Sequence, residues 1–251
     1  MKRTIPFVLL LLSCGPGNKK EKVGPKDTVA VDSLGQKVVR SYFPGGKTKS
    51  EVIYKNGKKN GVARTYDSDG SVILELPYVD DMREGTSKKY YAGGKVLAQT
   101  TEYKNNKMNG FQTRYRGNGD LMSEARYEDD FPCTELREYL ENKALKKKYP
   151  AIEIKVQNTM DMNGVYKLKI SLSERARTIK FYEGKLTSTG CMGDQLNYLL
   201  FDEATRTAEI SYRLPPGGFV MEELNIIAAY ETLMGNTAIA QRKYHVAVDN
   251  K

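Results

Sequence analysis

The hydrophobic positions between residues 42 and 127 lie in short segments rich in β-branched residues and tyrosine, separated by polar turns. Gly61–Tyr66 and Ser71–Tyr78 are two such segments. Between them, Asp67–Gly70 contains residues that tolerate positive φ, which predicts a tight turn. A second polar turn follows at Val79–Glu84. One unit is therefore a β-hairpin, and consecutive hairpins are expected to pair into a long antiparallel meander.

Three series of residues recur along this region at 24 residues, each with a single step of 25. In the first series a glycine follows a tyrosine by four residues, at Tyr42/Gly46, Tyr66/Gly70, Tyr90/Gly94 and Tyr115/Gly119. The second series consists of the tyrosines Tyr54, Tyr78, Tyr103 and Tyr127. The third consists of the glycines Gly61, Gly85 and Gly110. Agreement of three series makes the internal repeat a strong signal. The long steps share one place, so a single extra residue explains them, and we predict a β-bulge within Val96–Thr101.

From residue 150 onward the 24-residue spacing disappears and apolar residues alternate with polar ones. Asn163-Gly164, Glu183-Gly184 and Pro215–Gly218 separate these segments as turns. About seven short strands in roughly 100 residues predict an immunoglobulin-like β-sandwich. Glu222–Leu233 has a helical composition, but its alternation favours a strand. The predicted fold class is all-β, with hairpin repeats over 38–149 and a sandwich over 150–251.

Residues 131–149 have two interpretations. Leu136 and Leu140 form an i, i+4 apolar pair among helix-forming residues, which is typical of a helix. Tyr139 and Lys143, however, stand 24 residues after Tyr115 and Gly119. We prefer a degraded fifth hairpin, because terminal repeats often depart from the consensus to cap a sheet.

Several motifs of the repeats resemble those of MORN-repeat variants. They are Tyr-x-x-x-Gly, Glu-x-x-Tyr (Glu51/Tyr54, Glu75/Tyr78 and Glu124/Tyr127) and the pairs Asn60-Gly61 and Asn109-Gly110. More closely they resemble the YwqK-type "antitoxin" family, whose members are often bacterial lipoproteins. The resemblance covers roughly residues 38–130. It implies an interaction surface, and the family's name implies neutralisation of a toxin.

The N-terminus resembles a bacterial lipoprotein signal. Lys2 and Arg3 precede the apolar run Ile5–Leu12, which is too short to span a membrane, and Leu11-Leu12-Ser13-Cys14 follows. Residues 1–13 are therefore a predicted signal peptide, Cys14 the lipidated residue, and residues 14–37 a flexible leash. The alternative is an ordinary secretory signal with a chance cysteine. No aspartate follows Cys14 and the leash has no acidic cluster, which favours the periplasmic face of the outer membrane over the cell surface.

The formal net charge of +9 does not indicate a nucleic-acid partner. Residues 150–251 contain 12 basic and 12 acidic side chains, and the excess lies in the leash and at Lys143 and Lys146–Lys148. A nucleic-acid-binding protein would concentrate positive charge on its folded face. A solvated linker, or contact with anionic lipid head groups, explains the excess.

The sequence gives no sign of catalysis, a cofactor, a metal site or a small-molecule substrate. His245 is the only histidine, and it stands within an alternating segment. Cys133 and Cys191 are isolated, without the spacing of metal ligands. The acidic pairs Asp80-Asp81 and Asp129-Asp130 fall at turns, where Asp is favoured for backbone reasons.

Two features remain as candidate site residues. Cys133 and Cys191 would form a disulfide in an oxidising compartment, or would remain buried free thiols. The tyrosine ladder, Tyr54, Tyr78, Tyr103 and Tyr127, should stack on one face of the sheet. It is either the core of the repeats or an aromatic stripe that faces a partner.

We therefore predict a non-enzymatic, lipid-anchored envelope protein that binds another envelope protein, as an accessory subunit of an outer-membrane assembly. An antitoxin or immunity protein is the alternative. A polysaccharide-binding or peptidoglycan-binding module is a third interpretation.

Overall fold

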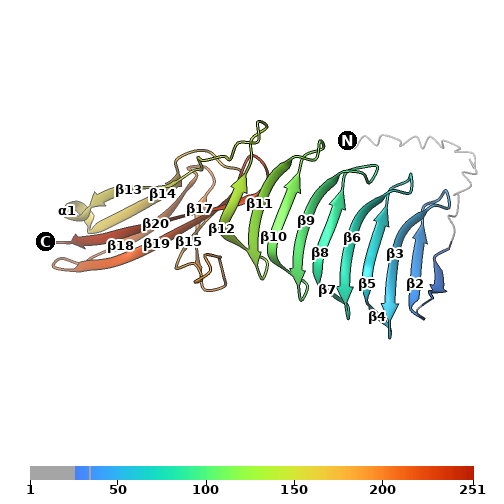
Figure 1. Cartoon of the computed structure of the whole chain (residues 1–251). Helices are drawn as coiled ribbons and strands as arrows, with labels where there is room; N and C mark the ends of the chain where they lie inside the picture. The colour runs from blue at the N-terminus through green and yellow to red at the C-terminus, as the bar shows by residue number, and fades with distance from the viewer. Residues whose placement is uncertain (1–25, 34) are drawn as a thin grey trace, which may run out of the picture.

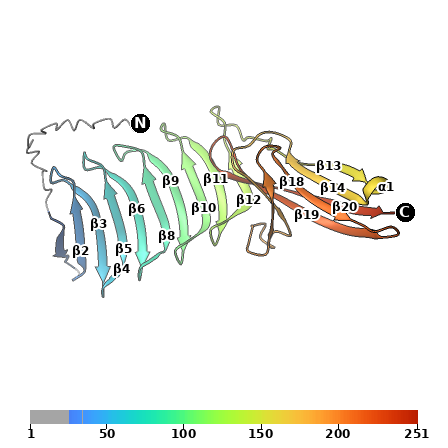
Figure 2. The same ribbon diagram turned by 180° about the vertical axis from the view of Figure 1, so that it is seen from behind.

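The computed structural model describes residues 26–33 and 35–251, and it confirms the predicted all-β class. The molecule is elongated, with one long antiparallel sheet along most of its length and two smaller sheets at one end (Figures 1 and 2). Cys14 and the signal peptide lie outside the described residues.

The long sheet contains twelve strands, and its path follows the chain. Along this path lie β1 (Thr28–Val31), β2 (Lys37–Tyr42), β3 (Thr48–Lys55), β5 (Gly61–Tyr66), β6 (Val72–Val79), β8 (Gly85–Tyr90), β9 (Leu97–Lys104), β10 (Lys107–Tyr115), β11 (Leu121–Glu128) and β12 (Phe131–Glu138). The short strands β4 (Lys58–Lys59) and β7 (Met82–Arg83) pair with β3 and β6. The sheet begins earlier than predicted, because β1 lies within the expected leash. Thr28, Val29 and Val31 favour an extended backbone there.

At one edge of the sheet, the hairpins close through two-residue turns in which both central residues have positive φ. The pairs are Asn56-Gly57, Asp80-Asp81, Asn105-Asn106 and Asp129-Asp130. This is the requirement of a type I′ turn, and Asn, Asp and Gly adopt it at low cost. The acidic pairs of the sequence are therefore turn residues.

These turns are joined laterally by reciprocal hydrogen bonds. The amide of Lys59 donates to Oδ1 of Asp81 at 2.8 Å, and the amide of Asp81 donates back to the Lys59 carbonyl at 2.9 Å. The same pair of bonds joins Arg83 to Asn106 and Met108 to Asp130. Each turn thus satisfies backbone groups of the hairpin before it, which fixes the spacing between repeats.

At the opposite edge, the Tyr-x-x-x-Gly motifs form the turns that the sequence predicts. The amide of Asp67 donates to the Ser71 carbonyl, and that of Gly70 to the Asp67 carbonyl. Gly70 has a φ of 93° and Gly119 a φ of 86°. The pairing register shifts by one residue beside each turn, as in three-residue hairpins with a left-handed glycine.

The prediction that the extra residue forms a bulge within Val96–Thr101 is wrong, because that residue lies in a turn. The amide of Tyr91 donates to the carbonyl of Val96, five residues on, whereas the equivalent bond from Asp67 reaches Ser71, four residues on. β8 and β9 then pair as their counterparts do, with Lys89 opposite Gln99. A turn absorbs an added residue without losing pairing in a strand.

The third series of glycines lies where pairing is interrupted within each hairpin. Between the pairs Tyr103–Met108 and Thr101–Gln112, one residue of β9 lies opposite three of β10. Gly110 occupies this bulge with a φ of 118°, and a Cβ there would lie 2.9 Å from the Cβ of Glu102. Glycine is required at this position by both its φ and its close neighbour.

Residues 131–149 form half of the expected fifth hairpin and no helix. β12 pairs with β11, and the amide of Leu140 donates to the Ala144 carbonyl, as in the other turns of this edge. Lys143 takes the glycine position with a φ of 63°. The returning strand is reduced to a single bridge between Tyr139 and Leu145, and the repeats end there.

The remaining strands form two four-stranded sheets. They are β13 (Ile152–Thr159), β14 (Val165–Leu172), β18 (Thr207–Arg213) and β17 (Phe201–Asp202) in one, and β16 (Asn197–Leu199), β15 (Ile179–Glu183), β19 (Phe219–Glu231) and β20 (Thr237–Asp249) in the other. A shared core joins them, in which Leu168 and Ile170 meet Phe181 and Ala228. The segment 222–233 is a strand up to Glu231, as its alternation predicted. The described helix α1 (Met160–Asn163) was not predicted.

We predict that Gly119→Ala lowers the free energy of unfolding by about 1–2 kcal/mol, because alanine resists positive φ. Gly117 lies in the same turn without that φ, and neither glycine has a heavy atom within 4 Å of a built Cβ. Gly117→Ala should therefore be neutral or slightly stabilising. Urea unfolding followed by tyrosine fluorescence measures both, and equal effects would contradict the prediction.

Candidate interaction face

The strand register assigns each side chain of the long sheet to one of two faces. Residues directly opposite each other share a face, and neighbours in sequence alternate outside the bulges. Tyr54 is opposite Lys59, Tyr78 opposite Arg83, and Tyr103 opposite Met108. We call the side that carries Tyr54, Tyr78, Tyr103 and Tyr127 the ladder face, and the other side the charged face.

The tyrosines of the ladder alternate with basic side chains. Nζ of Lys59 lies 5.1 Å from the ring centroid of Tyr78, and Cζ of Arg83 lies 4.3 Å from that of Tyr103. Each cation thus lies opposite one ladder tyrosine and reaches the ring of the next, within the range of cation–π attraction. Tyr54, Tyr78 and Tyr103 are half-buried, so the rings pack along the sheet and remain partly accessible.

The ladder face contains one carboxylate among its strand residues in β2–β12. It is Glu138, which is fully buried. The basic strand residues of this face are Lys37, Lys59, Arg83, Lys89 and Arg114. Lys37 and Lys89 are exposed. The ladder face therefore presents one sign of charge together with aromatic surface.

The charged face carries both signs in a single row. Arg40, Glu51, Arg64, Glu75 and Lys88 lie opposite one another on successive strands. Arg40 and Glu51 are 2.7 Å apart, and Arg64 is 3.2 Å from Glu75 and 3.8 Å from Glu51. The arginines and glutamates of this row pair with one another, and the row ends at the exposed Lys88. The Glu-x-x-Tyr motif therefore places its glutamate on the charged face and its tyrosine on the ladder face.

The first tyrosine series also lies on the charged face. The hydroxyl of Tyr90 donates to Glu75 at 3.1 Å, and that of Tyr139 donates to Glu124 at 3.1 Å. Burial raises the pKa of Tyr90 above its usual value, and the bond to the Glu75 carboxylate adds to the shift. Sequence reasoning did not separate the functions of the two tyrosine series. The common 15-residue spacing from Glu75 to Tyr90 and from Glu124 to Tyr139 was the available signal.

The sandwich covers the C-terminal end of the ladder face through the loop between β19 and β20. Nη1 of Arg114 donates to the Met234 carbonyl at 2.7 Å, and Oγ of Ser123 donates to Oδ1 of Asn236 at 3.0 Å. Tyr127 bonds to Thr237. Of the four predicted ladder tyrosines, Tyr127 therefore belongs to the junction with the sandwich.

Glu138 is the centre of this junction. Nζ of Lys146 lies 2.8 Å from its Oε2, and both Thr232 and Nδ2 of Asn236 donate to its Oε1. Burial alone would raise the pKa of Glu138, but the bonds from Lys146, Thr232 and Asn236 hold it below its usual value. The carboxylate is thus ionised and fully satisfied where the two parts of the chain meet.

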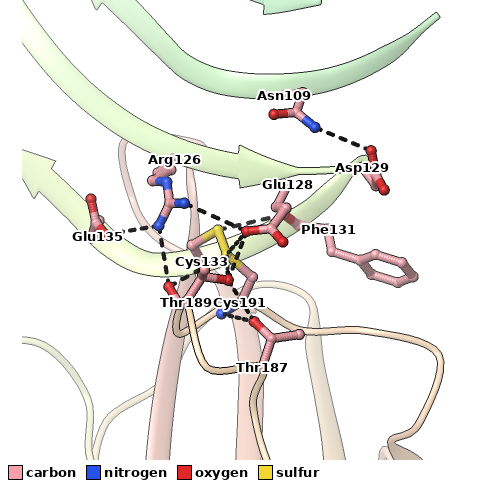
Figure 3. The surroundings of a disulfide bond; sticks show 10 residues. All are labelled: Asn109, Arg126, Glu128, Asp129, Phe131, Cys133, Glu135, Thr187, Thr189 and Cys191. Carbon is pink, nitrogen blue, oxygen red and sulfur yellow. Dashed lines mark hydrogen bonds and ion pairs between the residues drawn. A yellow bond between two sulfur atoms is a disulfide. The ribbon is translucent and has the colours of Figure 1, made fainter. Parts of the chain in front are cut away.

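A disulfide joins Cys133 of β12 to Cys191 of the sandwich, and both residues are buried (Figure 3). The amide of Thr134 donates to the Gly190 carbonyl, and that of Met192 to the Pro132 carbonyl, both at 3.0 Å. The segment around Cys191 therefore adds to the exposed side of β12 as a short strand would. This closes the C-terminal edge of the long sheet.

Polar side chains surround this disulfide. Oγ1 of Thr189 donates to Oε2 of Glu128 at 2.7 Å, and Nη1 of Arg126 donates to the Thr189 carbonyl at 3.2 Å (Figure 3). Glu128 and Arg126 come from β11, so the loop of the sandwich contacts the last two strands of the repeats.

The described part of the chain holds no group of three His, Cys, Asp or Glu residues placed to bind a metal ion. His245 is exposed, 3.6 Å from the carboxylate of Glu223. The only helix in that part has four residues, and no described helix could cross a bilayer.

Three consecutive segments, residues 36–56, 59–80 and 83–105, match the family model described as MORN repeat variant. Their boundaries follow the hairpins, so the first repeats of the sheet are MORN repeat variants, as the motifs indicated. MORN repeats commonly bind proteins or membranes and are generally not catalytic. No curated protein matches the chain.

We predict that Glu138→Gln lowers the free energy of unfolding at pH 7 by about 2–3 kcal/mol, because Lys146 loses its buried partner. The folded-state pKa of Glu138 is depressed, so its contribution is present above the unfolded value and is lost as pH falls through the folded value. The difference between variant and wild type should therefore shrink in acid. Urea titrations at pH 7 and pH 3 measure it.

Glu135→Gln is the matched control, because the Glu135 side chain is exposed in its pair with Arg126. It should change the stability by less than about 1 kcal/mol. An equal loss in both variants, or a Glu138→Gln deficit that persists unchanged in acid, would contradict the assignment of Glu138.

We predict that the oxidised protein migrates faster than the reduced protein on denaturing gels, and that Cys133→Ser removes the difference. The bridge closes a loop with a sequence separation of 58, so its loss should cost about 4 kcal/mol. Thermal unfolding with and without reductant measures that cost. Identical mobility of wild type and Cys133→Ser under oxidising conditions would refute the bridge.

Proposed function

We propose that this chain is a non-enzymatic, lipid-anchored envelope protein that binds a partner protein through the ladder face. The observation that carries the proposal is the difference between the two faces. On the charged face the arginines and glutamates pair with one another, whereas the strands of the ladder face offer tyrosines and basic groups without accessible carboxylates. Tyrosine and arginine are enriched at protein interfaces, and a surface with unpaired charge of one sign attracts its opposite.

The proposed anchor is Cys14, at the periplasmic face of the outer membrane. Its support is the sequence pattern around Leu11–Cys14. Thirteen residues separate Cys14 from Thr28, and such a segment reaches at most about 45 Å when extended. The first strand of the repeat sheet would thus lie within about that distance of the membrane.

We infer that the sandwich is immunoglobulin-like. Lettered A to G in chain order, with β16 as C′, its strands give the orders A-B-E-D and C′-C-F-G. These are the orders of immunoglobulin-type sandwiches. In this proposal the sandwich terminates the repeat sheet and supports an accessory role in an outer-membrane assembly.

The test compares two neighbouring lysines of β8 that lie on opposite faces. A photo-crosslinking amino acid replaces Lys89 on the ladder face, or Lys88 on the charged face; both side chains are exposed. In intact cells we expect crosslinks to an envelope protein from position 89 and few from position 88. Equal yields from both positions would refute the ladder face as the docking site, and capture of a small toxic protein would favour an antitoxin.

A further inference from the structure

The rungs of the ladder face have a regular spacing that restricts what can bind along them. Tyr54, Tyr78 and Tyr103 lie on β3, β6 and β9, two strands apart along the sheet. Neighbouring strands are about 4.8 Å apart, so successive tyrosines are about 9.6 Å apart. Lys59 and Arg83 lie between them and repeat at the same interval.

A polyproline II segment has nearly this period. It rises about 3.1 Å per residue with three residues per turn, so equivalent side chains recur at about 9.3 Å. An extended β-segment repeats at about 6.7 Å on one side, and a helical turn at about 5.4 Å. Of these conformations, polyproline II alone can place every third side chain against successive rungs.

The charge of the ladder face selects the residues of such a segment. Lys59 and Arg83 each stack on a tyrosine, and the exposed Lys37 and Lys89 flank the stripe. The only carboxylate on the strands of this face, Glu138, is buried at the junction. A carboxylate at every third position of the ligand would therefore meet a cation without a competing anion on these strands.

We propose, resting on the function proposed above, that the ladder face binds an acidic, proline-rich segment of the partner protein in polyproline II conformation. Prolines stack on the tyrosine rings, and carboxylates pair with Lys59 and Arg83. Prolines reduce the entropy lost on binding, because they hold the segment extended beforehand. The segment crosses the strands instead of extending the sheet, so it needs no free strand edge.

The first experiment compares three synthetic twelve-residue peptides on the full chain, measured by surface plasmon resonance. The peptide (Glu-Pro-Pro)4 should bind, whereas (Lys-Pro-Pro)4 should not. The third peptide has the composition of the first with its four glutamates clustered, and it should bind several-fold more weakly. Equal affinity for the ordered and clustered peptides would refute the spacing, and equal affinity for the glutamate and lysine peptides would refute the charge.

The second experiment reverses charges on the two faces in matched pairs. The double variant Lys59→Glu/Arg83→Glu on the ladder face should lower the affinity for (Glu-Pro-Pro)4 by roughly tenfold or more. Lys58→Glu/Lys88→Glu makes the same change in net charge on the charged face, and should leave binding unchanged. Lys59→Gln/Arg83→Gln, which adds no like charges, guards against misfolding and should also weaken binding. Unchanged affinity in both ladder-face variants would overturn the proposal.

Anionic phosphatidylglycerol vesicles provide the competing outcome. If the ladder-face variants abolish vesicle binding while (Glu-Pro-Pro)4 does not bind the wild-type chain, the ligand is a lipid surface and the proposal is wrong. If the peptide fails but crosslinking from position 89 still captures an envelope protein, the docking face stands and only the acidic, proline-rich chemistry is refuted.

Discussion

The lateral bonds between neighbouring turns are the constraint on which the repeat sheet depends. A single-layered sheet has water on both faces and cannot rely on a closed apolar core. The reciprocal bonds of Asp81 with Lys59, and of Asp130 with Met108, join each hairpin to the preceding one. One bond requires a turn residue whose side chain can accept a hydrogen bond, the other uses the backbone amide of the same residue, and the turn itself requires positive φ there. Asn and Asp meet both conditions, which explains why they recur at these turns.

Because each hairpin pairs with its neighbours, the outer strand at an end of the sheet has an edge without a partner strand. At the C-terminal end this edge is covered. The edge of β12 is covered by the segment around Cys191, and the disulfide holds that segment in place. Behind it, Glu138 fixes the loop between β19 and β20 over the last strands. The sandwich therefore acts as a structured end to the repeats as well as a second domain.

Most of the fold could be predicted from the sequence because the same pattern of turn and strand residues recurs in every repeat. Turn positions, hairpins and the alternating strands of the sandwich follow from φ requirements and period-two patterns. The extra residue was misplaced because its position within 95–102 cannot be read from spacing alone. The position of the extra residue is shown by the hydrogen bond from the Tyr91 amide to the Val96 carbonyl, and a backbone bond leaves no mark in the sequence. β1 was assigned to the leash because four residues beside a lysine-rich stretch give too short a pattern.

The candidate site was predictable only in part for a related reason. A repeat gives the residues that share a position, so the ladder of Tyr54, Tyr78 and Tyr103 could be proposed. It does not give the partner across the hairpin, because that depends on which residues of a polar stretch such as Val79–Glu84 form the turn; only Asp80 and Asp81 do. The two-residue turns bring Lys59 and Arg83 onto the ladder face, whereas alternation along β3 and β6 sends Glu51 and Glu75 to the opposite face.

The separation of charge between the two faces has a physical consequence for the function of the sheet. Glutamates on the charged face meet arginines of neighbouring strands, and this pairing holds strands together across repeats without attracting a partner. Lys59 and Arg83 of the ladder face meet tyrosine rings, which do not neutralise their charge. The arginine–glutamate pairs of one face thus contribute to the cohesion of the sheet, while the ligand proposed above would bind the other face.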